Sequence, residues 1–155
     1  MSFNRDTIRN IAENRRARRQ YEILERLEVG LALTGSEVKS LRGGKANIGE
    51  AYVRFENGEA WLADAHFPQY KQAGPHNNHE PTRPRKLLMK AKEIDKWSRR
   101  VAEKGLSVVA LQLYFKGSWV KLEIGLGRGR KLHDKRNLLK ERTDKREADR
   151  AIRQR

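Results

Sequence analysis

The sequence contains no cysteine, which excludes disulfide bonds and thiolate metal sites. It also has no apolar run near the ~18 residues that a membrane-spanning helix needs, and residues 1–20 lack the apolar stretch of a secretory signal. Proline is scarce outside one segment, since all four prolines fall between Pro68 and Pro84. These absences predict a cytoplasmic protein without disulfide bonds.

Acidic residues are outnumbered, with 20 Asp and Glu against 35 Lys and Arg and a net charge of +15. The excess is uneven, because residues 128–155 alone carry twelve basic against five acidic side chains. Lys and Arg gain affinity for phosphates by releasing condensed counterions, so nucleic acid is the leading partner. An anionic membrane is the rival partner, but the tail offers no broad apolar stripe. We expect a basic N-terminal arm over 1–20, a folded body over 21–127 and a basic tail over 128–155.

Short alternating apolar runs separated by turn signals fill the body. Asn57-Gly58 favours a tight hairpin turn, and Thr34 with Glu37 has the spacing of a capping box. In chain order, the predicted elements are a strand over 21–33 with a bulge near Gly30, a helix over 36–42, a hairpin over 51–67, a loop over 68–84, a strand over 85–90, a helix ended by Gly105 and a hairpin over 109–126. The pattern predicts a mainly β fold, a small antiparallel OB-fold-like barrel with two or three short helices.

The C-terminal segment has too few apolar residues to fold alone. We expect it to be disordered when free and helical once a partner covers it, with Asp134 as a possible N-cap. Gly125, Gly127 and Gly129 lack the lysine and the frame of a phosphate loop. They are interpreted as a flexible exit from the last strand.

The sequence shows no recognisable set of catalytic residues and no complete set of metal ligands. His76 and His79 have only Glu80 nearby and are interpreted as parts of a solvated loop. The sequence therefore predicts a binding protein without catalytic residues, metal or cofactor. A nuclease that uses His66 or His133 as its base remains a remote alternative.

Two basic clusters are candidate phosphate contacts. One is the segment 14–19, which includes Arg16 and joins directly to the first predicted strand; the other is Lys39, Arg42 and Lys45 around Gly43-Gly44. Ordinary solvated surface explains the second cluster about as well. The three tryptophans and four tyrosines are core residues by default, and any exposed ones would be able to stack on unpaired bases.

Several motifs, in one order along the chain, resemble the SmpB family, the small protein B or SsrA-binding proteins. They are NRRARRQY at 14–21, EVGLALTGSEVKSLRGGKANI at 28–48, NGEAWL at 57–62, PTRPRKLL at 81–88 and GLGRGRKLHDKR at 125–136. The resemblance implies an OB-fold-like barrel that binds transfer-messenger RNA (tmRNA, SsrA) and delivers it to stalled ribosomes for trans-translation. The barrel would replace the anticodon arm missing from that RNA, and the tail would enter the vacant message channel.

The resemblance also implies partners and residue roles. The partners are tmRNA and the small ribosomal subunit, with elongation factor Tu and alanyl-tRNA synthetase met through tmRNA, and the protein is expected to be a monomer. Together with the basic clusters, the RNA-binding candidates are Asn14, Arg16, Glu28, Lys39, Arg42, Lys45, Asn47 and Leu88. The ribosome-binding candidates in the tail are Arg130, Lys131, His133, Asp134, Lys135 and Arg136.

Three alternatives stay open. Glu28 either accepts hydrogen bonds from RNA or holds a neighbouring arginine in place. Leu88 is either an RNA contact or a plain core residue of its strand. The whole chain is either a tmRNA partner or a general RNA-binding or ribosomal protein, with the same charge but no preference for a transfer-RNA-like elbow.

Overall fold

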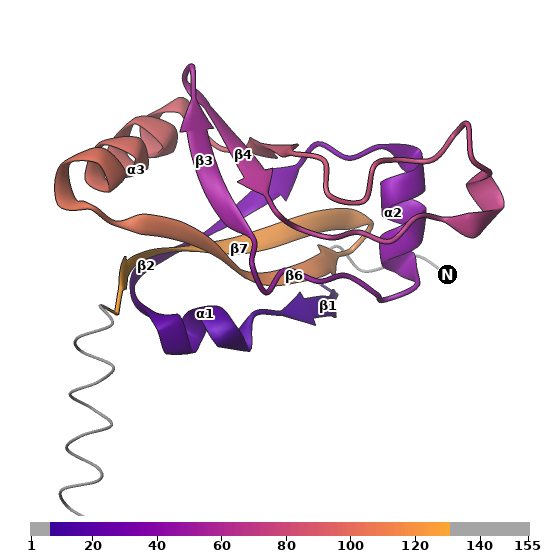
Figure 1. The fold of residues 1–155 in the computed structure, drawn as a ribbon, viewed down its shortest axis with the longest axis horizontal. Coiled ribbons are helices and arrows are strands. Elements are labelled where there is room, and N and C mark those ends of the chain that lie inside the picture. The colour runs from indigo at the N-terminus through magenta and orange to yellow at the C-terminus, as the bar shows by residue number, and fades with distance from the viewer. Residues whose placement is uncertain (1–6, 131–155) are drawn as a thin grey trace, which may run out of the picture.

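The computed structural model describes residues 7–130 as a seven-stranded antiparallel sheet that closes on itself (Figure 1). The strand order is β1-β6-β3-β4-β5-β2-β7, and β6 also pairs with β7, so every strand except β1 belongs to a ring. The elements are β1 Ile8–Glu13, α1 Arg15–Gln20, β2 Tyr21–Leu31, α2 Gly35–Arg42, β3 Tyr52–Glu56, β4 Glu59–Ala63, the 3-10 turn η1 Lys71–Ala73, β5 Arg85–Leu88, α3 Ala91–Lys104, β6 Ser107–Lys116 and β7 Trp119–Gly129. The mainly β, antiparallel fold class is confirmed.

Long strands form one part of the ring and short strands the other. β7 pairs with β2 and with β6 over most of its length. The short strands β3, β4 and β5 join this part through few pairs, because β3 meets β6 only at Tyr52 and Val109, and β5 meets β2 at Gly30 and Leu31. The ring is therefore narrowly closed where β3 approaches β6.

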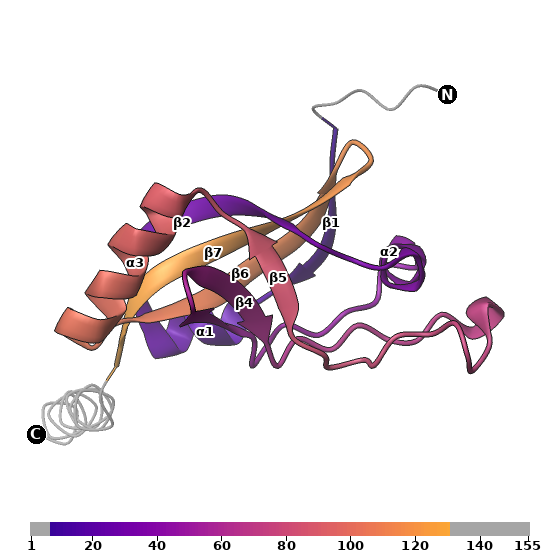
Figure 2. The same ribbon diagram turned by 90° about the horizontal axis from the view of Figure 1, so that it is seen from above.

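Alternating apolar residues of the strands fill the inside of the ring. Leu62, Leu113, Leu122 and Ile124 are fully buried there. The helix α3, ended by Gly105 in the left-handed conformation with φ 62°, adds the buried Trp97 to the same core. α3 lies across one end of the sheet beside β2 (Figure 2).

Two predicted turn and cap signals are confirmed. Asn57 and Gly58 both have positive φ, 51° and 75°, as the tight turn between β3 and β4 requires. At α2 the Thr34 side chain accepts from the Glu37 backbone N–H, while the Glu37 carboxylate accepts from the Thr34 backbone N–H.

A buried ion cluster of Glu37, Arg83 and Arg85 connects α2 to the start of β5. The Glu37 carboxylate accepts from both Arg83 and Arg85, and the side chains of Glu37 and Arg85 are fully buried. Arg85 also donates to the carbonyls of Ala65 and Pro81, 2.9 Å each, and its guanidinium carbon lies 3.9 Å from the centre of the Phe67 ring. Burial alone would raise the pKa of Glu37, but the hydrogen bonds from Arg83, the Thr34 backbone and Arg85 outweigh it and lower that pKa.

Residues 8–20 differ from the arm expected outside the barrel. β1 pairs with β6 along Lys116 to Gln112, and Ala17 of α1 is buried against Val109 and Leu111. β6 therefore has apolar residues on both faces, and its outer face holds β1 and α1 against the sheet through the buried Asn14 and Ala17.

Two predictions about glycines and bulges were wrong. The bulge in β2 lies between Ile23 and Glu25 instead of near Gly30. The glycines at the end of β7 belong to the strand instead of a flexible exit, because a Cβ on Gly125 would stand 2.7 Å from Leu111 Cδ1. Close packing between strands explains these glycines.

Glu25 interrupts the apolar alternation of β2 because it faces α3. Its carboxylate pairs with Arg100 at 2.9 Å and with Lys96 at 3.7 Å.

Among residues 7–130, no helix is long and apolar enough to cross a membrane. The predicted tail helix and Lys131, His133, Asp134, Lys135 and Arg136 lie outside the described residues.

Candidate nucleic-acid interface

Asn14 occupies a buried position between β1 and α1. Its side-chain oxygen accepts from the Ala17 backbone at 3.0 Å, which caps α1. Both protons of its amide are used as well, since Nδ2 donates to the carbonyls of Ile48 and Ala110, each at 2.8 Å. The side chain is 2% exposed and fully hydrogen-bonded, so it ties α1 to the segment 46–49 and to β6.

α1 brings the first basic cluster next to the end of β7. Arg15, Arg16, Arg18 and Arg19 are exposed on this helix. Arg128 and Arg130 join them, because Arg128 pairs with Glu22 across β2 and β7, and the Arg130 backbone N–H donates to Gln20 at 2.9 Å. We call these six arginines the α1 surface. The basic residues of segment 15–19 and those at the end of β7 thus meet at one place, which charge counts along the sequence could not show.

The second basic cluster lies around the end of α2. Arg42 and Lys45 are exposed, and Arg9 joins them by donating to the Arg42 carbonyl at 2.8 Å. Lys39 lies 5.8 Å from the centre of the Tyr70 ring. Asn47 is exposed beside them, and its side-chain oxygen accepts from the Gly49 backbone at 2.9 Å. The exposed guanidinium and ammonium groups of this cluster suit phosphate contacts.

Glu28 lies on the outer face of β2 with 38% of its side chain exposed. It accepts from the Tyr114 hydroxyl and, at 3.3 Å, from Lys116 Nζ. The hydrogen bond from Tyr114 is the main cause of a lowered pKa of Glu28, with Lys116 and Lys121 adding to it against desolvation. The carboxylate is therefore ionised and held at a fixed place. Among residues 7–130, no arginine contacts this carboxylate, so Glu28 keeps a structural role, with Tyr114 and Lys116 as its partners in place of an arginine.

Leu88 is a surface residue, with 59% of its area exposed. The plain core reading is wrong, because β5 turns Arg85 and Leu87 inward and leaves Leu88 outside. Its side chain lies over Gly30, where an added Cβ would be 3.2 Å from Leu88 Cδ1. Gly30 and Glu28 point to the same face of β2, about 7 Å apart along the strand. We call this face the Glu28–Leu88 surface.

Sequence reasoning missed Tyr114 and Lys116 as the residues that position Glu28. The signal was present in β6, because Gln112, Tyr114 and Lys116 alternate with the core residues Leu113 and Phe115 and so share the opposite face. The pairing of that face with β2 needed the register through β7, in which Glu123 lies opposite both Glu28 and Gln112.

The remaining candidates separate by exposure. Trp97 is 3% exposed and belongs to the core, whereas Trp119 at the β6-β7 turn is 73% exposed. His79 is buried instead of solvated, with Nδ1 at 2.9 Å from Ser36 Oγ and Nε2 at 2.9 Å from the Phe67 carbonyl. Within residues 7–130, His, Asp and Glu side chains form no cluster of three or more that would hold a metal.

Comparison with known proteins identifies a family. The model of the family described as SmpB protein matches residues 11–154. An SsrA-binding protein of Microcystis aeruginosa is 54% identical over 95% of this chain and 96% of its own length, and one from Thermosynechococcus vestitus is 52% identical over 97% and 99%. A solved structure described as "tmRNA-SmpB: a journey to the center of the bacterial ribosome" superposes with a TM-score of 0.66 and 43% identity, covering 80% of this chain and 87% of that one.

Proposed function

The chain belongs to the SmpB protein family, and on this premise we propose that it binds tmRNA and delivers it to stalled ribosomes for trans-translation and ribosome rescue. In this proposal the protein binds and positions tmRNA and catalyses no reaction. The partners are tmRNA and the small ribosomal subunit, which places the protein in the cytoplasm. Elongation factor Tu and alanyl-tRNA synthetase meet the protein through tmRNA, and the protein acts as a monomer.

The exposed Leu88 beside the fixed carboxylate of Glu28 is the observation that carries the assignment of the tmRNA site. Leu88 contributes little to the core, so an apolar side chain at this place is explained by a partner that covers it. A carboxylate that is already ionised and oriented accepts hydrogen bonds from base amino groups or from 2′-hydroxyls. Phosphate groups have no such donor, so this carboxylate favours contacts with bases and sugars. The Glu28–Leu88 surface therefore suits the shaped elbow of a folded RNA.

The basic groups supply the remaining contacts. The α2 cluster of Lys39, Arg42, Lys45 and Asn47 contacts phosphates and sugars near the elbow. Arg16 contacts RNA phosphate from α1, and Asn14 acts by holding α1 in place. Arg130, Lys131, His133, Asp134, Lys135 and Arg136 begin the tail, which enters the vacant message channel while the barrel replaces the anticodon arm. Basic residues on every side of such a tail match a channel lined by phosphates.

A competition experiment tests this function. Labelled tmRNA is bound to the full-length protein and displaced by unlabelled tmRNA or by bulk transfer RNA, at two salt concentrations. We expect tmRNA to compete better than bulk transfer RNA, and the difference to persist at the higher salt because it rests on shaped contacts. Equal competition would favour the second candidate, a general RNA-binding or ribosomal protein.

A further inference from the structure

A small cleft lies between α1 and the segment that leads into β3. Its walls are Asn14, Arg16, Ala17, Gln20 and Tyr21 on one side and Gly49, Glu50, Ala51 and Tyr52 on the other, with Val109 of β6 between them. Its volume is about 210 Å³, below the ~300–1,000 Å³ of sites that enclose a drug-sized ligand. The cleft has room for a single small planar group.

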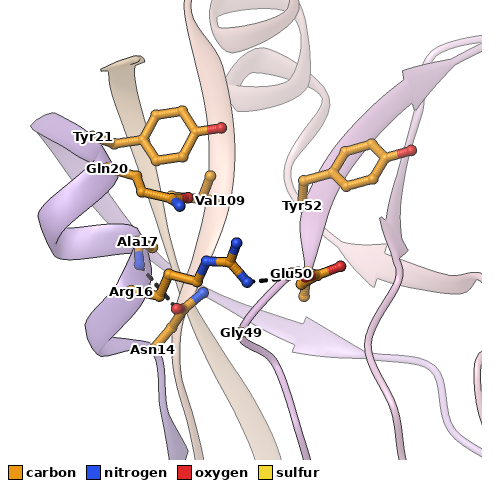
Figure 3. A pocket seen from close by; sticks show the side chains of 10 residues that line it. Asn14, Arg16, Ala17, Gln20, Tyr21, Gly49, Glu50, Tyr52 and Val109 are labelled. Atoms are coloured by element: carbon orange, nitrogen blue, oxygen red, sulfur yellow. Dashed lines mark hydrogen bonds and ion pairs between the residues drawn. The ribbon is translucent and has the colours of Figure 1, made fainter. Parts of the chain in front are cut away.

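Two tyrosines stand at the mouth of this cleft. Figure 3 shows the Tyr21 ring on the α1 side and the Tyr52 ring on the β3 side, with the Arg16–Glu50 ion pair reaching between the two walls below them. Tyr52 is 39% exposed. The same two tyrosines also line a second hollow of about 460 Å³ that runs toward α3 along Val53, Phe55 and Val101. The tyrosines thus stand where two adjoining hollows meet.

The fold holds Tyr21 in this position. Gly129 lies beneath its ring, since an added Cβ there would be 3.6 Å from Tyr21 Cε1, and a Cβ on Gly127 would be 3.2 Å from Tyr21 Cβ. Gly127 and Gly129 therefore leave the space in which Tyr21 packs. β3 pairs with β6 only at Tyr52 and Val109, and both residues line the cleft.

The ion pair across the cleft is easy to open. Arg16 and Glu50 are 2.9 Å apart, but their side chains are 56% and 73% exposed, and exposed pairs of this kind contribute little to stability. Arg16 is able to leave Glu50 for a phosphate without disturbing α1, because Asn14 anchors the helix separately. The other arginines of the α1 surface are exposed on α1 and at the end of β7, on the side of the cleft that α1 forms.

The cleft lies far from the Glu28–Leu88 surface. Tyr21 and Glu28 are seven residues apart on β2, roughly 23 Å at the usual rise of a strand. The cleft instead adjoins the place where the chain leaves β7 for the tail, at the hydrogen bond between Arg130 and Gln20. An RNA that contacts the tail is therefore the RNA within reach of the cleft.

We propose that the cleft between Tyr21 and Tyr52 receives one unstacked base of the small-subunit ribosomal RNA, with Arg16 released from Glu50 to bind the adjoining phosphate. This inference rests on the proposed function, and it adds a nucleotide-binding site to the folded body. Tyrosine faces accept any base by stacking, and arginine supplies the charge that the phosphate requires.

Binding to purified small ribosomal subunits and to tmRNA, measured separately, tests the site. We expect Tyr52→Leu to weaken subunit binding about fivefold or more and to leave tmRNA affinity unchanged, while Tyr52→Phe, which keeps the ring, restores subunit binding. Trp119→Leu is the matched control, because it removes an exposed aromatic ring outside the cleft. Unchanged subunit binding by Tyr52→Leu, or an equal loss of both affinities, would overturn the inference. Failure of the wild-type protein to prefer tmRNA would instead contradict the proposed function.

A second variant is expected to raise the affinity for small ribosomal subunits instead of lowering it. Glu50→Gln removes the partner that holds Arg16, so subunit affinity is expected to rise about twofold or more, whereas Arg16→Gln is expected to lower it. No increase with Glu50→Gln would count against the release of Arg16.

Crosslinking of the wild-type protein avoids any effect of mutation on folding. After ultraviolet irradiation of the complex with small subunits and trypsin digestion, we expect ribosomal nucleotides on the peptides 20–26 or 46–54, which carry Tyr21 and Tyr52. Crosslinks found only on other peptides would overturn the proposal.

Discussion

Two glutamates, each held by hydrogen bonds from two neighbouring side chains, occupy very different regions of this molecule. Glu37 is fully buried at the junction of α2 and β5, where Arg83 and Arg85 donate to it. Glu28 is 38% exposed on β2, where Tyr114 and Lys116 donate to it. The pKa of both carboxyls is lowered. Burial, and not charge or pKa, therefore distinguishes a group that holds the fold from a group that is available to a partner.

The largest expected effect is on the buried side of this comparison. Glu37→Gln leaves the buried Arg85 guanidinium without its counter-ion, so we expect the free energy of unfolding to fall by about 3–5 kcal/mol. Urea denaturation followed by circular dichroism measures it. The control is Glu56→Gln, which removes an exposed pair with Arg54 and is expected to cost less than about 1 kcal/mol. Equal effects of the two substitutions would contradict the structural role of Glu37.

The stabilisation by Glu37 has a defined dependence on pH. Since the folded-state pKa lies below the ordinary value of 4.5, the contribution is fully present above that value and is lost as pH falls through the lowered pKa. We expect the difference in unfolding free energy between wild type and Glu37→Gln to stay constant from pH 7 to about 5 and to shrink below it. A difference that grows on acidification would have the wrong sign.

On the exposed side, Leu88→Ala separates binding from stability. Loss of a side chain that RNA covers is expected to weaken tmRNA binding about tenfold. Because Leu88 is exposed, the free energy of unfolding should change by less than about 0.5 kcal/mol. Leu87→Ala is the matched control, since its buried neighbour on the same strand should lose stability instead. Unchanged tmRNA affinity for Leu88→Ala would remove the main support for this site.

Glu28→Gln tests whether shape or charge dominates. The substitution makes the protein more positive, so counterion release alone would keep or raise the affinity for RNA. We expect it to lower tmRNA affinity severalfold, because the amide is a weaker acceptor and offers one acceptor oxygen instead of two. Affinity for an unrelated folded RNA, measured in parallel, should stay equal or rise. Loss of affinity for both RNAs would point to a structural role for Glu28.

Tyr114→Phe should have the smallest effect. The hydroxyl orients Glu28, and Lys116 remains as a second partner at 3.3 Å. We expect tmRNA affinity to fall about twofold to threefold, with no further loss when the substitution is combined with Glu28→Gln. Fully additive losses would mean that Tyr114 contacts the RNA independently of Glu28.

Local signals predicted much of the fold, because turns and alternation act over a few residues. The hairpin at Asn57-Gly58, the cap at Thr34 and the β6-β7 hairpin follow from such signals. The strand order within the closed sheet and the place of α1 did not follow, because they depend on contacts across the chain such as Ala17 on Leu111. The glycines of β7 were misread for the same reason.

The site divides in the same way. The basic clusters follow from composition, and Glu28 and Leu88 were identified through family motifs, yet neither their shared face nor the exposure of Leu88 could be deduced from the strand pattern. The burial of Arg85 was not predicted, because it begins a strand whose other inward residue is apolar and because arginine is usually exposed. The cleft between Tyr21 and Tyr52 joins residues thirty-one positions apart, which no local signal connects.

The central claim is that tmRNA is recognised by the folded body and the ribosome by the tail with the α1 surface. The most direct measurement compares tmRNA affinity of the full-length protein with that of a protein ended after Arg130, using unrelated folded RNA of equal mass as the reference at two salt concentrations. The account predicts that the shortened protein keeps its preference for tmRNA at the higher salt. Loss of that preference on removal of residues 131–155 would contradict it.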